Sequence, residues 1–389
     1  MCMSFTPYLK VPLSFESQAQ LLVERGIQGD FDFIVKRLRS VNYYRLSAYW
    51  ISCLQCGEDG EKLDVFIPGT RFEDIWACYA FDRRLRLHVT DALERIEIDF
   101  KTNFINVLTM KTGDSFAHLN EKNFPGFPLP KPLPGGQRKN YDFKNTVRLF
   151  DSFTKRSREQ FVREHREKYS GDLPFWKSCE VIPFGVASTL FEGLDNHTKR
   201  IIGSRYGMSA LVFENAIKHL CYVRNLCAHH SRLWNRVLAI RFSVPVKKNL
   251  PIFHAPRKIP NNKVFGTLSL IRYFMAIIAP QSRWAKNFEE LFSDIPIALM
   301  HEMGFPEDWK NFDLWKDKIP EQALQKSGGG GGGGAGAEFG GGAGKDELAA
   351  GVSAAGSELD EPVGAADDVA VVLDNDERVA GVAQLKEQV

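Results

Sequence analysis

A long apolar stripe constrains the fold of this chain more than any other feature of its sequence. Large apolar side chains recur at helical spacing from Phe72 to Phe104, over more than thirty residues. Thr70 and Glu73 have the spacing of a capping box, which predicts that a helix begins there. We therefore expect one long helix that acts as a structural spine.

Helical spacing also dominates the rest of the chain, so the predicted fold class is all-α. Ser14 and Ser209 are predicted to cap two of these helices. A stretch rich in proline and glycine, residues 125–136, is predicted to be an exposed loop. The expected helical stretches lie near residues 14–26, 31–50, 145–169, 174–191, 209–236, 268–278, 284–291 and 297–303.

The composition changes abruptly near residue 327, which predicts two parts. Residues 1–326 form the expected helical body, and residues 327–389 are rich in glycine, alanine and acids. Seven consecutive glycines, Gly328 to Gly334, cannot bury enough surface to offset the entropy lost on ordering. We therefore predict a disordered acidic tail.

The formal charge of +2 hides an uneven distribution. The tail carries twelve acidic and three basic residues, so its net charge is −9 and that of the body is +11. A basic body favours nucleic acid as the partner, and the tail is expected to screen it from stray polyanions. Seven scattered cysteines indicate reduced thiols, and no signal core or membrane span is visible, so we predict a cytoplasmic protein without membrane contact.

The segment from Tyr222 to Arg236 concentrates the chemistry of the chain. Its sequence, YVRNLCAHHSRLWNR, places the arginine Arg224, the amide Asn225 and the adjacent histidines His229 and His230 within a few turns of an expected helix, about 210–236. Any one of these residues alone is best explained as part of a solvated or core face. Their combination favours a functional site.

This segment resembles the Arg-polar-x-x-x-His signature of HEPN ribonucleases, which are small helical domains. The run RNLCAHHSRLWNR also resembles the corresponding region of Abi-like (AbiD/AbiF-type) abortive-infection proteins. Three further blocks, in the same order, are similar to that family: VNYYRLSAYW at residues 41–50, FDRRLR through ERIEI at 81–98, and PFWKSCE with FG at 174–185. The resemblance covers residues 10–300 approximately.

The resemblance implies a HEPN-like helical fold with additional N-terminal helices, and a homodimer in which two motifs face each other. It also implies RNA as substrate and a possible regulatory noncoding RNA as partner. Glu180 is expected, from the family-like block alone, to brace Arg224. No cofactor and no metal are expected.

The side chains themselves suit RNA cleavage, because RNA carries its own nucleophile in the 2′-hydroxyl. A histidine can accept or donate a proton near neutral pH, and an arginine can stabilise the charged phosphate. The two side chains lie about 140° apart on an ideal helix, so a distorted helix, a bent arginine or a second copy must bring them together. Asn225 lies one turn before His229 and can orient its imidazole, and either His229 or His230 can carry the proton, with His229 favoured.

Four further cations are predicted to hold RNA phosphates: Lys218, Arg232, Arg236 and Arg241. We therefore predict a metal-independent endoribonuclease of HEPN type that leaves 2′,3′-cyclic phosphate ends and acts as a toxin against cellular or phage RNA. The alternative is a non-catalytic RNA-binding regulator that uses the same basic groove.

Two other patterns compete with this interpretation. Arg83 and His88 repeat the Arg-x4-His spacing, but they lie in a different family-like block and are not expected to form a second site. A metal phosphohydrolase would use the His229–His230 pair with a following aspartate, and Ser231 stands there instead.

Overall fold

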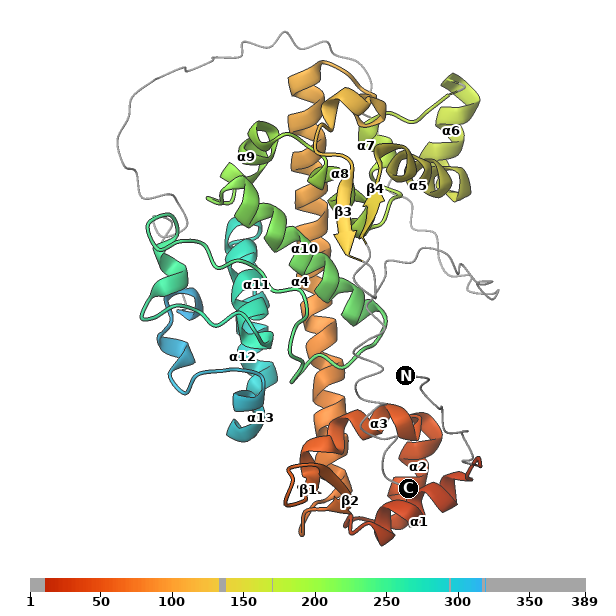
Figure 1. Ribbon diagram of the computed structural model, residues 1–389, viewed down its shortest axis with the longest axis vertical. Helices are drawn as coiled ribbons and strands as arrows, with labels where there is room; N and C mark the ends of the chain where they lie inside the picture. Colours follow the sequence, from red (N-terminus) through yellow and green to blue (C-terminus); the bar gives the residue numbers. More distant parts are fainter. Residues whose placement is uncertain (1–10, 133–137, 170, 294, 317–318, 320–389) are drawn as a thin grey trace, which may run out of the picture. The chain divides into compact units, whose positions relative to one another are not determined.

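The computed structural model describes residues 11–132, 138–169, 171–293, 295–316 and 319 (Figure 1). Two units are distinguished, one of residues 1–129 and 141–327 and the other of residues 130–140 and 328–389. The first unit contains all the helices described below. The predicted acidic tail, residues 327–389, lies outside the described residues.

The predicted spine is present as helix α4 (Phe72–Thr112), which is 41 residues long. Its buried side chains follow the apolar stripe, and it ends at Gly113, whose φ of 65° closes the last turn. The predicted capping box was wrong. The Thr70 hydroxyl donates to the Ile67 carbonyl instead, so Arg71 precedes the helix without a side-chain cap.

Three short helices precede the spine, each with a side-chain cap at its first turn. They are α1 (Phe15–Glu24), α2 (Phe31–Ser40) and α3 (Tyr43–Trp50), and their caps are Ser14, Asp30 and Asn42. The predicted cap at Ser14 is therefore confirmed. Strands β1 (Leu54–Cys56) and β2 (Lys62–Phe66) then form an antiparallel pair.

The proline-rich stretch contains a short strand that its composition did not predict. Strand β3 (Leu129–Pro132) pairs with β4 (Arg138–Tyr141), so this part of residues 125–136 is extended backbone rather than a plain loop. Residues 133–137 lie outside the described residues. Proline suits a strand at the edge of a sheet because its missing N–H leaves no ladder bond broken there.

Most of the remaining helices follow the predicted stretches, but a helix at residues 196–204 was not predicted, and two of the stretches, 145–169 and 174–191, each contain two helices. The stretch 145–169 is two helices, because Ser157 takes an extended conformation that ends α5. The helices are α5 (Phe143–Arg156), α6 (Gln160–Tyr169), α7 (Phe175–Ser178), α8 (Phe184–Glu192), α9 (Asn196–Ser204), α10 (Ala210–Ala228), α11 (Val264–Ile278), α12 (Trp284–Phe292) and α13 (Ile297–Glu302). Short 3-10 turns are η1 (Ile51–Cys53), η2 (Ala117–Leu119), η3 (Glu121–Asn123), η5 (Pro251–His254), η6 (Trp309–Asn311) and η7 (Asp313–Trp315).

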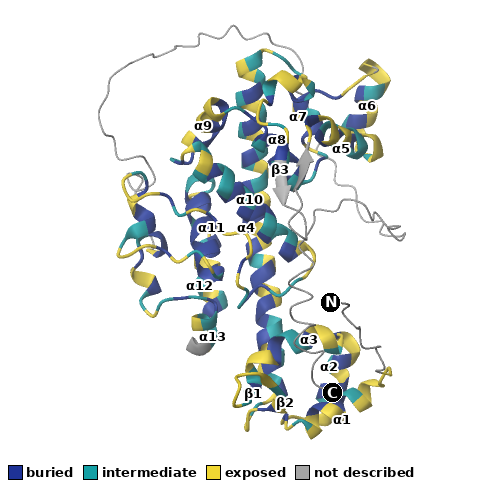
Figure 2. Cartoon of the chain, in the orientation of Figure 1, coloured by how far each residue is buried: buried dark blue, intermediate teal, exposed yellow. Residues whose placement is uncertain are grey.

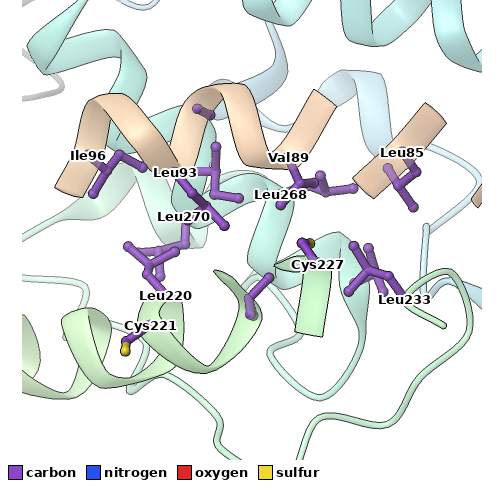
Figure 3. Close-up of a cluster of buried hydrophobic side chains, with 14 of the residues drawn as sticks. Leu85, Val89, Leu93, Ile96, Leu220, Cys221, Cys227, Leu233, Leu268 and Leu270 are labelled. Atoms are coloured by element: carbon purple, nitrogen blue, oxygen red, sulfur yellow. The ribbon is translucent and has the colours of Figure 1, made fainter. Parts of the chain in front are cut away.

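Helix α4 is the centre of the core in the larger unit, where it packs against α3, α8, α9, α10, α11 and α12. Figure 2 shows its buried residues as a dark blue band along the helix. Side chains of α4, α10, α11 and the segment after α10 meet in one apolar layer (Figure 3), formed by Leu85, Val89, Leu93, Ile96, Leu220, Cys227, Leu233, Leu268 and Leu270 among others. The fold is mostly helical, so the all-α prediction is confirmed apart from the two small strand pairs.

None of the described helices combines the length and the apolar character that crossing a lipid bilayer requires.

Candidate functional site

The helix that carries Arg224 is shorter than the sequence predicted. Ser209 caps α10 by accepting from the backbone N–H of Val212, as expected, and the helix ends at Ala228 rather than near residue 236. His229 is its C-cap, and the chain beyond it is turn and extended backbone. The histidines therefore stand at the end of a helix rather than in its middle.

A left-handed turn at His230 ends the helix. Its φ of 56° makes His230 the single non-glycine residue with positive φ in the described part of the chain. The N–H of Ser231 donates to the Leu226 carbonyl at 2.9 Å, and that of His230 donates to the Cys227 carbonyl at 3.0 Å, which is the Schellman arrangement. Glycine usually occupies this position, and a histidine there costs about 1–2 kcal/mol of backbone strain.

A buried carboxylate anchors the chain that follows this turn. Asp82 of α4 is fully buried and accepts hydrogen bonds from the backbone N–H groups of Leu233 and Trp234, at 3.2 and 2.8 Å. It also accepts from the Tyr49 hydroxyl at 2.6 Å and forms an ion pair with Arg86 one helical turn later. The residues after the motif are thus held by a carboxylate whose surroundings exclude water.

The electrostatics of this anchor follow from its burial. Burial raises the pKa of the Tyr49 hydroxyl, which therefore stays a hydrogen-bond donor. Burial also raises the pKa of Asp82, while Arg86, Tyr49 and the two amides oppose that effect by stabilising the carboxylate. Although burial disfavours its charge, Arg86 has a raised pKa because Asp82 lies beside it.

Helix α3 holds the turn from another direction. The Arg45 guanidinium donates to the His230 carbonyl at 2.6 Å, and the Arg232 guanidinium donates to the Ala48 carbonyl. Arg45 also lies only four residues before Tyr49, which binds Asp82. Three sequence blocks, residues 41–50, 81–86 and 224–234, therefore meet at one place.

Arg224 faces α4. Its Nε lies 3.9 Å from Oε2 of Glu97, which also forms an ion pair with Lys101 at 2.7 Å. The Arg224 side chain is 39% exposed and that of Glu97 is 15% exposed, so the guanidinium borders solvent with a carboxylate behind it. Glu180, expected to brace Arg224, is an exposed residue after α7, and the ion pair described for Arg224 is the one with Glu97.

The other motif residues have surroundings different from those of Arg224. His229 and His230 are exposed, Asn225 is half-buried, and the His229 N–H donates to the Asn225 carbonyl at 2.9 Å. Among the described contacts, none joins Arg224 to either imidazole. One chain therefore brings the arginine and the histidines into one region without pairing them directly.

The four predicted phosphate-binding cations have different surroundings. Lys218 forms ion pairs with Glu192 at 3.1 Å and Glu214 at 2.8 Å, and these carboxylates raise its pKa although burial opposes the effect. Arg232 is half-buried against α3, and burial lowers its pKa, with a further contribution from Arg236.

The remaining two cations follow the turn. The Nε of Arg236 donates to the Arg232 carbonyl at 2.9 Å. Arg241 is exposed, and its Nε donates to the Leu238 carbonyl at 3.4 Å. Of the four cations, Arg241 is thus the exposed one whose guanidinium has solvent around it.

The prediction from sequence did not include Asp82, Arg45 or Glu97 in the site. All three lie in or beside the family-like blocks near residues 41–50 and 81–98, which was the available signal. Within the described ranges, no group of three or more histidine, cysteine, aspartate or glutamate side chains is arranged to hold a metal ion.

Comparison with known proteins identifies the family. The model of the family described as Abi-like protein matches residues 36–235, which is more than half of the chain. No curated protein and no solved structure matches the chain significantly. The matched segment begins before α3 and ends one residue before Arg236, so it contains Asp82, Arg224 and both motif histidines. The family's name refers to abortive infection, and by this match the chain belongs to the Abi-like protein family.

Proposed function

We propose that this protein is a metal-independent endoribonuclease of the HEPN type, which acts as an abortive-infection effector against cellular or phage RNA. The observation that carries the proposal is the construction at the end of α10. Two exposed imidazoles, His229 and His230, stand on a strained turn that Asp82 and Arg45 hold in place. Strain maintained by surrounding contacts is typical of functional sites.

The chemistry available there suits transphosphorylation of RNA. His229 accepts the proton of a 2′-hydroxyl, whose oxygen attacks the adjacent phosphorus, and the 5′-oxygen of the next nucleotide leaves with a proton from a second imidazole. The products are a 2′,3′-cyclic phosphate and a 5′-hydroxyl. Arg224 stabilises the additional negative charge on the phosphate in the transition state.

A second copy of the chain supplies what one copy lacks in this proposal. On an ideal helix the side chains of Arg224 and His229 would point about 140° apart, and in the structure Arg224 faces Glu97 rather than an imidazole. In a homodimer with two motifs facing each other, His229 of one subunit deprotonates the 2′-hydroxyl, and Arg224 of the other stabilises the phosphate that the 2′-oxygen attacks. A regulatory noncoding RNA would control such an enzyme by binding to the two motifs in place of the substrate.

One observation favours the alternative, a non-catalytic RNA-binding regulator. In the single chain, the charge of Arg224 is partly offset by Glu97, and none of the described contacts joins Arg224 to His229. A regulator needs only an exposed basic surface and no alignment of proton carriers. The two functions are separated by whether the protein changes RNA covalently.

The test uses the purified full chain, total RNA and excess EDTA. We expect wild type to produce fragments with 2′,3′-cyclic phosphate ends and Arg224→Ala to cleave at least about 100-fold more slowly. Arg83→Ala is the matched control, because Arg83 is an exposed arginine on α4 with the same spacing to a histidine.

The outcomes are distinct. If wild type binds RNA without cleaving it, the nuclease proposal is contradicted and the RNA-binding regulator is supported. Cleavage that EDTA abolishes and Mg²⁺ restores would replace the proposed mechanism with a metal-dependent one. Equal loss of cleavage in Arg83→Ala and Arg224→Ala would contradict a specific role of the Arg224–His229 motif in cleavage.

A further inference from the structure

The aromatic block at residues 43–50 divides into buried rings and one exposed ring. Tyr49 and Trp50 are in the core, and the Tyr43 hydroxyl accepts a hydrogen bond from Arg25 at 2.7 Å. Tyr44 is 59% exposed. Its backbone groups bind Asn42 and Ser47, and no hydrogen bond or ring contact of the described residues involves its side chain. The density of aromatic residues is thus explained by core packing at three positions but not at Tyr44.

Two contacts place Tyr44 beside the motif turn. Its neighbour Arg45 donates to the His230 carbonyl at 2.6 Å. Ala48, one helical turn after Tyr44 and on the same face of α3, accepts from the Arg232 guanidinium. Tyr44 therefore lies within one helical turn of both points at which α3 touches the residues following α10.

We propose that Tyr44 is a stacking platform for an unpaired base of a single-stranded RNA whose backbone passes His229 and His230. This inference rests on the proposed function and adds its substrate class. A tyrosine ring stacks on any base through the π-face of that base, which gives binding without strict sequence preference. Arg45 supplies N–H donors beyond the one that it uses on His230, and these can bind the phosphate next to the stacked base.

The geometry selects single strands over duplexes. A ring that projects from a helix surface can stack only on a base whose face is open, and bases inside a duplex have both faces covered. A duplex would meet Tyr44 with its sugar–phosphate edge, where the ring offers little. Loops, bulges and single-stranded ends of RNA are therefore the expected substrates.

The experiment measures binding to a fluorescein-labelled single-stranded oligonucleotide in which fluorine replaces every 2′-hydroxyl. Such a strand lacks the nucleophile and cannot be cut by transphosphorylation. The full chain is compared as wild type, Tyr44→Ala, Tyr44→Trp and Tyr169→Ala, with the same strand annealed to its complement as the duplex probe. Tyr169, at the end of α6, is the matched control because it is 58% exposed and its ring packs on His165.

We expect Tyr44→Ala to weaken single-strand binding about tenfold or more, and Tyr44→Trp to bind as tightly as wild type or tighter. Tyr169→Ala should bind like wild type, and duplex binding should be weaker and insensitive to Tyr44. Unchanged binding by Tyr44→Ala, or equal losses for the two probes, would overturn the platform. Weak binding by Tyr44→Trp as well as Tyr44→Ala would also overturn it, since stacking should survive the tryptophan.

Failure of this inference can be told from failure of the proposed function. If wild type cuts total RNA in EDTA and Tyr44→Ala binds the single strand normally, the proposed nuclease activity is supported and the role of Tyr44 as a stacking platform is contradicted. If wild type binds neither the single strand nor the duplex, both the proposed function and the stacking platform are contradicted.

Discussion

The same spacing, arginine followed five positions later by histidine, occurs twice in this chain with opposite structural outcomes. In α4, Arg83 is exposed, whereas the His88 ring stacks on Trp284 with ring centroids 4.6 Å apart. Burial there lowers the pKa of His88 to about 4. At the end of α10, Arg224 borders solvent and His229 is exposed.

The difference lies in where each pair falls on its helix. Within the continuous helix α4 the two side chains point about 140° apart, and Arg83 faces solvent while His88 packs on Trp284. At the end of α10, the chain turns at His230, and both His229 and His230 are exposed to solvent. The motif becomes a candidate site because the helix stops there, and spacing alone does not achieve this.

The largest expected effect is on cleavage. His229→Ala should lower the cleavage rate by about 10²- to 10⁴-fold, because a general acid–base group contributes about that factor. His88→Phe, which keeps the stack on Trp284, should cleave like wild type. Rates are measured on a labelled single-stranded RNA in EDTA.

A smaller loss in His230→Ala than in His229→Ala assigns the main proton transfer to His229, and the reverse order assigns it to His230. An equal loss of cleavage rate in His88→Phe and His229→Ala would show that the Arg224–His229 pair has no catalytic role that the Arg83–His88 pair lacks.

The next largest effect is on stability, and it tests Asp82, the buried carboxylate that holds the chain after α10. Asp82→Ala should lower the free energy of unfolding by about 3–5 kcal/mol, because it leaves Arg86 buried without its partner. Asp91→Ala is the control, since Asp91 forms an exposed ion pair with Arg95 one turn apart and should cost about 0.5 kcal/mol. Both are measured by urea unfolding, and similar values would show that the Asp82 cluster does not stabilise the chain after α10.

How far the sequence predicted these features depends on the range of the interactions involved. The caps at Ser14 and Ser209 and the spine α4 were predictable, because capping and helical periodicity depend on neighbouring residues. The anchor was not, because Asp82 binds backbone N–H groups 151 and 152 residues away, and a backbone amide has no sequence signature.

The early end of α10 was unpredictable for a related reason. His230 occupies a position that glycine usually marks, so the sequence contained no stop signal there. Arg232 was predicted to bind phosphate from its charge, which no contact tests, and its hydrogen bond to the Ala48 carbonyl was not predictable from the sequence.

A third prediction concerns how the stability of the chain depends on pH through His88, the histidine of the Arg83–His88 pair. His88 has a pKa of about 4 in the folded chain and about 6.5 when unfolded, so the unfolded state binds more protons between these values. Stability is complete above pH 6.5 and falls as the pH is lowered toward 4, by at most ~3 kcal/mol for this group.

The measurement is the free energy of unfolding of wild type and His88→Phe between pH 4 and 7. The variant should lose less stability on acidification. Part of the slope remains, because burial also lowers the pKa values of His118 and His219 to about 4. Identical slopes for the two proteins would show that His88 does not contribute.

The smallest expected effect concerns the turn itself. His230→Gly should raise the free energy of unfolding by about 0.5–1 kcal/mol, because glycine adopts positive φ without strain but loses more entropy on folding. Ala228→Gly, at the last residue of α10, should instead destabilise by about 0.5–1 kcal/mol. A destabilised His230→Gly would indicate that the His230 side chain contributes more than its backbone strain costs.

The contact between Arg45 and His230 joins positions 185 residues apart in the chain. The turn therefore gains this support only when α3 packs against the chain that follows α10. The position of the His230 backbone is thus set by tertiary packing and not by the helical hydrogen bonds of α10 alone.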